Sequence, residues 1–222
     1  MSKPTLFYFP VRGRAELIRL ILAEAGVEYQ EHPIGQGTPP LNGRPTDFTA
    51  LKASPLLPFG QAPVWEEPDG FLLAQSGAIA SHLARSHGLL GQTPREAAQC
   101  EQVLGAFDDV RAELRKLASV APEARAALRE QLATQFLPRW FGYFDRLLRA
   151  NRGGAGGLVG EAVSVADLAL WYLVELCQDN GLGAAAAAYP ALVAFAARIA
   201  QRPRLAAYLR SPRRPPFAPL PT

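Results

Sequence analysis

The chain has 222 residues, of which 49% are hydrophobic and 19% are charged, a composition that supports a buried core and excludes an intrinsically disordered protein. Its two cysteines and three histidines form neither a CxxC pair nor a metal-ligand pattern, which excludes a disulfide scaffold and predicts a reducing compartment and no metal site. The net charge of +3 permits an anionic partner without requiring one, and because no stretch has the pattern of a signal peptide or a membrane span, we expect a cytoplasmic protein.

The first 87 residues predict alternating strands and helices. In the first predicted helix, apolar residues recur on one face, and Gly26 follows as a C-terminal stop. A Gly/Pro-rich loop over 35–45 follows the second strand. Pro68-Asp69-Gly70 is a turn sequence between two short apolar runs, which indicates a β-hairpin. The predicted elements are strands over 5–9, 27–34, 62–65 and 71–74 and helices over 17–25, 47–54 and 76–87, in the order β-α-β-α-β-β-α.

From Arg95 onward the pattern is helical throughout, with a flexible break over 151–157. Ser164 and Asp167 have the spacing of an N-terminal capping box, which predicts the start of a buried apolar helix. The predicted helices cover 95–119, 122–149, 164–178, 189–202 and 203–209. We expect an α+β thioredoxin-like domain over 1–87, a linker over 88–94, an all-α domain over 95–211, and a Pro-rich tail, extended or disordered, over 212–222.

The residues around the start of the first helix decide which chemistry is open to this fold. A thioredoxin-like redox enzyme needs a CxxC motif there, but this chain has Pro10-Val11-Arg12-Gly13, so disulfide exchange by its own thiols is excluded. Tyr8 ends the first strand, and its hydroxyl can donate a hydrogen bond to an anion, such as a thiolate, at the helix N-terminus. Lowering a free thiol pKa of ~8.5 by ~2 units requires about 2.7 kcal/mol, within reach of one good hydrogen bond plus local dipoles. The alternative is a strand aromatic packed in the core, which is the more common case for this position alone.

Two further features favour a site for a peptide and an anion. Ala62-Pro63 precedes the hairpin strand, and a cis-proline there would leave neighbouring backbone groups free to pair with an extended peptide; an ordinary edge-strand proline is the alternative. Gln75-Ser76 lies where the last strand turns into a helix. Ser76 is a candidate N-cap, and a helix N-terminus with a hydroxyl can bind a carboxylate, although a plain N-cap is the more common function of a single serine.

Six segments, in their order and spacing, resemble the cytosolic glutathione transferases, most closely the pi class and next the sigma class. These segments are YFPVRGR (8–14), LKAS (51–54), FGQAP (59–63), QS (75–76), VSVAD (163–167) and RPRLAAYL (202–209). The resemblance covers almost the whole chain. It implies a homodimeric enzyme that uses glutathione as co-substrate, conjugates it to a small hydrophobic electrophile, and holds no permanently bound cofactor.

The family pattern implies a role for each matching position. Tyr8 corresponds to the catalytic tyrosine that holds the glutathione thiolate. Gln61 and Ala62 correspond to the residues that bind the cysteinyl part of glutathione, and Pro63 corresponds to the cis-proline. Gln75 and Ser76 correspond to the residues that bind the γ-glutamyl group. The basic residues Arg14 and Lys52, of which Lys52 reaches the glycyl carboxylate, and the acid Asp109 complete the glutathione-binding positions. Asp109, with Asp108 beside it, corresponds to an acid that crosses the dimer interface to the partner's γ-glutamyl group.

The chain departs from the family pattern at the glycyl end of the glutathione site, where Phe48 is the expected glutathione-binding residue, and around the electrophile. Phe48 replaces the tryptophan that usually lines the glycyl end, and Ser119 stands near the pi-class tyrosine of the electrophile site. Phe9 and Val11 are expected to form apolar walls of the electrophile pocket. Phe59 is expected to be the aromatic key that inserts into the partner subunit, and the alternative is a loop aromatic packed on its own domain.

Two other functions are compatible with this architecture. One is a binding, regulatory or structural protein on the same fold, which the joint presence of Tyr8, Pro63, Gln75 and Ser76 argues against. The other is nucleic-acid binding by a cluster of arginines, but aromatic interleaving and a recognised motif are both missing, so we expect solvated helix faces and neither a nucleic-acid nor a membrane partner. The cluster consists of Arg198, Arg202, Arg204, Arg210, Arg213 and Arg214.

Overall fold

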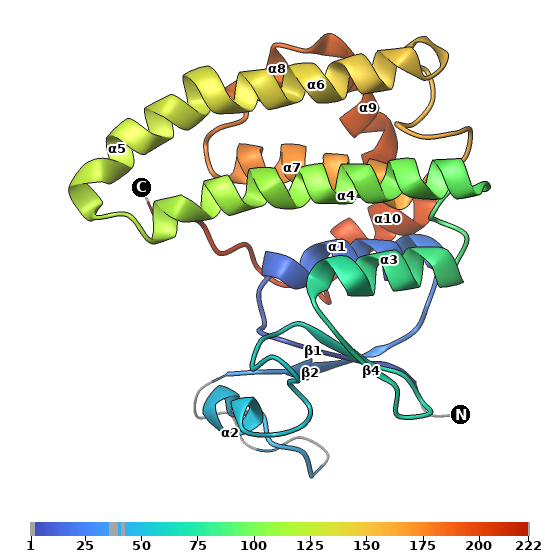
Figure 1. Ribbon diagram of the computed structural model, residues 1–222, viewed down its shortest axis with the longest axis vertical. Helices are drawn as coiled ribbons and strands as arrows, with labels where there is room; N and C mark the ends of the chain where they lie inside the picture. Colours follow the sequence, from blue (N-terminus) through green and yellow to red (C-terminus); the bar gives the residue numbers. More distant parts are fainter. Residues whose placement is uncertain (1–2, 36–39, 41–42, 222) are drawn as a thin grey trace.

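The computed structural model describes residues 3–35, 40 and 43–221, which form a sheet with helices on both faces, followed by a helical region (Figure 1). The strands are β1 (Thr5–Tyr8), β2 (Gln30–Pro33), β3 (Val64–Glu66) and β4 (Leu72–Ala74). The α-helices are α1 (Glu16–Ala25), α2 (Phe48–Lys52), α3 (Ser76–Ser86), α4 (Pro94–Arg115), α5 (Pro122–Gln131), α6 (Leu137–Ala150), α7 (Val165–Asp179), α8 (Ala184–Ala187), α9 (Pro190–Ala200) and α10 (Pro203–Leu209). Short 3-10 turns cover Gly13–Ala15, Lys116–Ala118 and Arg152–Gly154. No helix in these described ranges is long and apolar enough to cross a membrane.

The strand order of the sheet is β2-β1-β3-β4, with β1 and β2 parallel and the other two pairs antiparallel. Phe7 pairs with Val64, and Val64 pairs with Ala74. The end of β1, the start of β3 and the end of β4 therefore lie in one row at the same edge of the sheet. This row brings together residues that are far apart in the sequence.

The sheet is covered on both faces, and two hydrophobic cores hold the layers together. Figure 1 shows α1 and α3 between the sheet and the pair α4 and α7, with α2 on the opposite face. A small core under α2 buries Phe7, Leu51 and Val64. The larger core runs from the α1 side of the sheet into the helical region and includes Ile18 and Leu173. Burial of these apolar side chains is the main force that fixes the helical region on the sheet.

The predicted order of elements in the first 87 residues is confirmed. Gly26 has a φ of +73°, the left-handed conformation that glycine adopts after a helix, and it ends α1 as predicted. The second strand is shorter than the predicted range 27–34. The third begins at Val64 rather than at residue 62, because Pro63 has no N–H to contribute to the ladder. The predicted loop over 35–45 lies partly outside the described residues.

The helical region differs from the prediction at two points. The helix predicted over 122–149 is observed as α5 and α6 with a π-helical segment over Leu132–Phe136 between them, which the regular apolar pattern did not indicate. The short helix α8 was not predicted, because four consecutive alanines carry no apolar periodicity. The remaining predicted helices are observed as α4, α7, α9 and α10.

The C-terminal tail is extended, as one of the two expected alternatives, and its described residues pack against the start of α1 and against α7. The guanidinium of Arg214 forms ion pairs with the fully buried Glu16, at 2.7 Å, and with Glu175. The Arg12 side chain donates a hydrogen bond to the carbonyl of Pro215 at 3.3 Å. The tail therefore ties the loop that follows β1 to the central helix of the helical region.

Candidate active site

A cavity of about 440 Å³ lies at the edge of the sheet where β1 ends and β3 begins, and it gathers most of the predicted site residues. Its lining residues are Tyr8, Phe9, Arg14, Phe48, Gln61, Ala62, Pro63, Gln75, Ser76 and Arg115. All of these except Arg115 were predicted from the sequence. We call this cavity the cleft. Arg115 comes from the end of α4, far along the chain from the others, and no sequence pattern linked it to them.

Tyr8 is the last residue of β1 and is 7% exposed, so only its hydroxyl end reaches the cleft. The hydroxyl oxygen accepts a hydrogen bond from the backbone N–H of Arg14 at 2.8 Å. Since the oxygen accepts this bond, the hydroxyl proton remains available to an anion. The ring of Tyr8 is buried, as the aromatic-core alternative has it, and Tyr8 also lines the cleft, so the binding of an anion by its hydroxyl stays a prediction.

The loop between β1 and α1 approaches Tyr8 so closely that one position requires glycine. A Cβ built on Gly13 would lie 2.5 Å from the Tyr8 hydroxyl oxygen, and the φ of Gly13 is +45°. Tyr172 on α7 donates a hydrogen bond to the Gly13 carbonyl at 3.0 Å and so fixes this loop from the helical region. The backbone N–H of Arg14 is thereby held against Tyr8.

The segment before β3 has the predicted cis peptide bond, which joins Ala62 to Pro63. Because β3 begins at Val64, the backbone groups of Gln61 and Ala62 lie outside the ladder with β1 and border the cleft. Backbone groups in this position are available to an extended peptide that adds to the edge of the sheet.

The prediction that Ser76 caps α3 is wrong. Gln75 is the N-cap residue, because its carbonyl accepts the hydrogen bond from the N–H of Ile79 at 2.9 Å, and Ser76 is the first residue of the helix. Gln75 has a φ of +72°, a left-handed conformation that costs a non-glycine residue of order 1–3 kcal/mol and occurs most often at functional sites. This conformation turns the chain so that both residues border the cleft.

The acidic residues on α4 lie differently from each other. Asp108 lies against the start of α3, where its Oδ2 would be 3.4 Å from a Cβ on Gly77, and its Oδ1 is 3.7 Å from the guanidinium of Arg111. Asp109 is exposed on the neighbouring side of the helix and does not line the cleft of its own chain. Its expected reach across a dimer interface remains a prediction. Asp108 is the sequence neighbour of Asp109. The apolar residues Phe107 and Val110 mark the buried side of α4, and this periodicity could have indicated that Asp108 lies nearer to that side than Asp109.

Three other predicted residues, Lys52, Val11 and Phe59, are not among the residues that line the cleft. The Lys52 Nζ is 4.6 Å from the ring centroid of Phe48, which itself packs edge-on against Phe9 at 5.0 Å. Val11 is half-buried against the larger core. Phe59 is 67% exposed, so it is not packed on its own domain, and insertion into a partner subunit remains a prediction.

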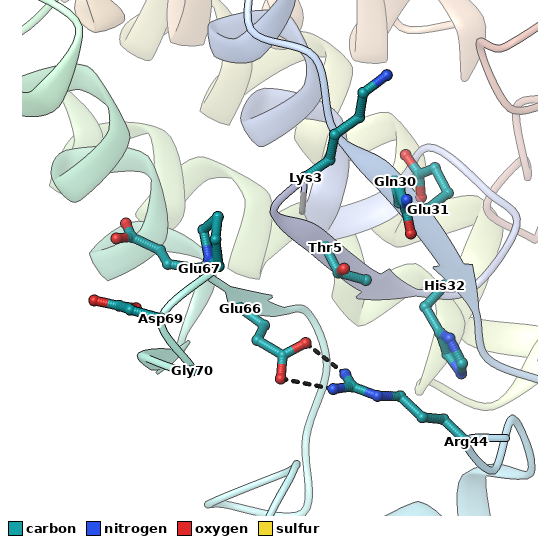
Figure 2. Close-up of a pocket in the computed structure, with 11 residues that line it drawn as sticks. Lys3, Thr5, Gln30, Glu31, His32, Arg44, Glu66, Glu67, Asp69 and Gly70 are labelled. Atoms are coloured by element: carbon teal, nitrogen blue, oxygen red, sulfur yellow. Dashed lines mark hydrogen bonds and ion pairs between the residues drawn. The ribbon is translucent and has the colours of Figure 1, made fainter. Parts of the chain in front are cut away.

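A second cavity, of about 450 Å³, lies at the opposite end of the sheet and contains none of the predicted site residues (Figure 2). Figure 2 shows Arg44 pointing toward Glu66, and their charged groups are 2.5 Å apart. Lys3, the other Lys or Arg that lines it, pairs with Glu28 at 2.8 Å. Because both cations already have carboxylate partners, this cavity has less to offer an anionic ligand than the cleft.

The two cysteines, Cys100 and Cys177, are fully buried and not disulfide-bonded. Burial raises the pKa of both thiols, that of Cys177 to about 12. The part of the chain that the structure describes contains no group of three or more His, Cys, Asp or Glu side chains that could hold a metal ion.

We expect neither cysteine to react with a disulfide reagent at about pH 8 in the folded protein, because only an exposed thiolate is nucleophilic, whereas both thiols are fully buried and burial raises the pKa of each. Colorimetric titration should therefore release less than about 0.1 equivalents from native protein and both equivalents in denaturant. Rapid reaction of one thiol in native protein would show that its burial is wrong.

Comparison with known proteins places the chain in a specific family. Residues 4–85 match the family described as glutathione S-transferase, N-terminal domain, and residues 108–212 match glutathione S-transferase, C-terminal domain. Glutathione S-transferase P of Bos taurus is 35% identical over 219 residues, covering 96% of this chain and 94% of that protein. Glutathione S-transferase P 1 of Xenopus laevis is 32% identical over 206 residues, covering 93% and 91%.

Solved structures give the same result for the fold. The pi-class glutathione S-transferase of Onchocerca volvulus superposes with a TM-score of 0.80 at 28% identity, covering 94% of this chain and 92% of that one. The structure of NaGST-2 gives a TM-score of 0.77 at 32% identity, covering 96% and 98%. The predicted α+β thioredoxin-like domain followed by an all-α domain is confirmed.

Proposed function

The chain belongs to the glutathione S-transferase family and is a glutathione transferase, and from this premise we propose that Tyr8 ionises the glutathione thiol for attack on an electrophile with an apolar body. The observation that carries the proposal is the hydrogen bonding of the tyrosyl hydroxyl. Its oxygen accepts from the Arg14 N–H at 2.8 Å, and its proton is left to donate to an anion in the cleft. A donated hydrogen bond stabilises a thiolate more than a thiol and so lowers the thiol's pKa.

We assign a separate set of groups to each of the three parts of glutathione. We assign the γ-glutamyl carboxylate to the N-terminus of α3, where Ser76 supplies a hydroxyl, and the γ-glutamyl ammonium to the neighbouring Asp108 and, across a dimer interface, to Asp109 of the partner subunit. The backbone at Ala62 pairs with the cysteinyl part and directs its sulfur toward Tyr8.

The glycyl end and the second subunit complete the proposed arrangement. Lys52, held against the ring of Phe48, is assigned to the glycyl carboxylate, and Arg14 adds positive charge near the peptide. Phe59, exposed in the single chain, is assigned to a homodimer interface as the side chain that enters the partner.

The proposed reaction is nucleophilic addition or substitution by sulfur. The thiol first loses its proton to solvent, and Tyr8 stabilises the resulting thiolate by donating a hydrogen bond. In a substitution on a chlorinated aromatic ring, the sulfur–carbon bond then forms, and the carbon–chlorine bond breaks with chloride taking the electron pair. Phe9, the residue after Tyr8, supplies an apolar surface beside the reacting sulfur, and Phe48 packs against it at 5.0 Å on the side of the glycyl end.

The two other functions considered for the sequence are less well supported. Relatives named glutathione S-transferase P match the chain over 96% of its length, which favours an enzyme over a non-catalytic binding protein. Of the six C-terminal arginines, Arg198, Arg204, Arg210 and Arg213 are exposed, as expected, and Arg202 and Arg214 are partly buried. Most of them bind carboxylates or carbonyls: Arg198 binds the Gly156 carbonyl, Arg202 binds Glu24, Arg204 binds the Glu24 and Ala25 carbonyls, Arg213 binds the Tyr29 carbonyl, and Arg214 binds Glu16 and Glu175.

Replacing Ser76 by alanine tests the assigned place of glutathione. We expect the KM for glutathione to rise about tenfold with kcat little changed, because one hydrogen bond to a carboxylate is lost and the thiol is still ionised. Steady-state kinetics with chlorodinitrobenzene and retention on glutathione resin measure this. Ser86→Ala, at the other end of α3, is the matched control and should behave like wild type. An unchanged KM for Ser76→Ala would place the γ-glutamyl group elsewhere.

A further inference from the structure

Arg115 lies at the last residue of α4, and it differs from the other residues that line the cleft. The others come from the first 76 residues, in the half of the chain that we assign to glutathione, whereas Arg115 belongs to the helical region. Figure 1 shows α4 running along the helical side of α1, and Arg115, the last residue of α4, lines the cleft. Because glutathione is assigned to the residues of the first half of the chain, we place the electrophile beside the helical region.

The side chain of Arg115 is a cation with no counter-ion among the described residues. It is exposed, and none of the ion pairs or hydrogen bonds between described side chains involves it. The neighbouring acid on the helix, Glu113, pairs instead with Lys116 at 2.7 Å. The described residues that line the cleft include two arginines and neither an aspartate nor a glutamate.

The charges around Arg115 make this end of the cleft more positive. Arg111 lies one helical turn earlier, and like charges at this spacing repel each other. Arg111 is 6% exposed and faces Asp108 at 3.7 Å, so the nearest carboxylate is engaged there rather than with Arg115. An anion beside Arg115 would relieve the repulsion and supply the missing counter-ion.

The anionic groups of glutathione have partners without Arg115 in the proposed arrangement. Its two carboxylates are assigned to the start of α3 and to Lys52, with Arg14 nearby, and its thiolate to Tyr8. Arg115 is therefore a cation of the cleft to which no group of glutathione is assigned, and it lies on the side where we place the second substrate.

We propose that Arg115 is a specificity-determining residue that selects aromatic electrophiles carrying a carboxylate. The inference rests on the proposed function, and it narrows the electrophile to one chemical class. The guanidinium binds the carboxylate through paired N–H donors, while the ring packs on Phe9. The carboxylate is not altered in the reaction, in which sulfur replaces the leaving group on the ring.

A pair of substrates that differ only in charge tests the proposal. Chlorodinitrobenzoate and its methyl ester have the same ring and leaving group. Each kcat/KM is divided by the rate constant of the uncatalysed reaction between that substrate and free glutathione at the same pH, which removes differences in intrinsic reactivity. We expect Arg115→Gln to lower the normalised kcat/KM for the acid about fivefold and to leave that for the ester unchanged. Arg115→Lys should retain part of the preference, because it keeps the charge and loses the paired donors.

The controls separate failure of this inference from failure of the proposed function. Arg95→Gln removes an exposed arginine from the other end of α4 and should leave the acid-to-ester ratio at its wild-type value. If wild type conjugates the ester but Arg115→Gln leaves the ratio unchanged, or raises the KM for glutathione equally with both substrates, the inference is overturned and the proposed function stands. If wild type conjugates chlorodinitrobenzene but neither of these substrates, the inference is overturned, and if it conjugates none of the three, the proposed function itself fails.

Discussion

The Tyr8→Phe variant is expected to conjugate glutathione to chlorodinitrobenzene roughly fiftyfold more slowly than wild type at about pH 6.5, while glutathione binds nearly as tightly. The reason is the fraction of bound thiol that is ionised. A hydrogen bond from Tyr8 that lowers the pKa from ~8.5 by ~2 units leaves about half of the thiol ionised at that pH, and without it about one hundredth is ionised. Tyr8 touches only the sulfur in this arrangement, so the contacts that hold the rest of the tripeptide remain.

The dependence on pH distinguishes this role from a structural one. Because Tyr8 lowers the pKa of the bound thiol, its advantage is largest below ~pH 6.5 and disappears as the pH rises above ~8.5, where both enzymes hold thiolate. The midpoint of the pH profile of kcat/KM for chlorodinitrobenzene, measured with the enzyme saturated with glutathione, should move upward by ~2 pH units in Tyr8→Phe. Tyr143→Phe, which alters an exposed tyrosine on α6, is the matched control. Superimposable pH profiles for Tyr8→Phe and wild type would show that Tyr8 does not stabilise the thiolate.

The second large effect is expected on stability, from Asp167 at the start of α7. Its side chain is fully buried and accepts hydrogen bonds from the N–H groups of Leu158 at 2.7 Å and Ser164 at 2.8 Å, as part of the predicted capping box, which is confirmed. Alanine at this position leaves two buried N–H groups without a partner. We expect Asp167→Ala to lower the free energy of unfolding by about 3–5 kcal/mol.

Denaturant unfolding of a graded series of variants measures this effect. Ser164→Ala should cost about 1 kcal/mol, because it removes the cap hydroxyl and leaves the Asp167 carboxylate in place. Asp69→Ala, in the exposed hairpin turn, should change the midpoint least, since its one bond to the Phe71 N–H lies in solvent. The m-value should stay constant across the series. A loss of less than about 1 kcal/mol for Asp167→Ala would show that the buried N–H groups find other partners.

Local signals predicted the first half of the fold well, because each element carries its own boundary. Gly26 ends α1 in the left-handed conformation, and Pro68-Asp69-Gly70 lies between β3 and β4 as the turn sequence indicated. The π-helical segment over Leu132–Phe136 has no comparable signal, because an inserted residue in a helix depends on the packing of its neighbours.

Most residues that line the cleft were predicted from segments that resemble the family, although Val11 and Lys52 of those segments do not line it, and a contact from a distant element was missed. Ser76 was assigned as the N-cap from residue type, but the cap lies at Gln75, whose positive φ no propensity favours for glutamine. Arg115 enters the cleft from the end of α4, and this depends on how the helical region sits on the sheet. Burial of the larger core sets that placement, and it follows from side chains spread over both halves of the chain.

The contacts of the C-terminal arginines could not be predicted from the sequence for the same reason. Arg202 and Arg214 were expected to be solvated, and their carboxylate partners Glu24 and Glu16 lie on α1, near the other end of the chain. Two arginines of the cluster therefore form ion pairs within the fold, while Arg198, Arg204, Arg210 and Arg213 stay exposed. The net charge of +3 says little about partners once these pairs are known.

The most direct test is a pH titration of glutathione bound in the cleft, in which the ultraviolet absorbance of the thiolate measures how much of the thiol is ionised. The account predicts that glutathione bound to wild type ionises with a pKa ~2 units below that of free glutathione, and that in Tyr8→Phe this pKa returns close to the free value of ~8.5. A bound pKa equal to the free value in wild type, or one equally lowered in both proteins, would contradict the assignment of Tyr8 as the residue that activates the thiol.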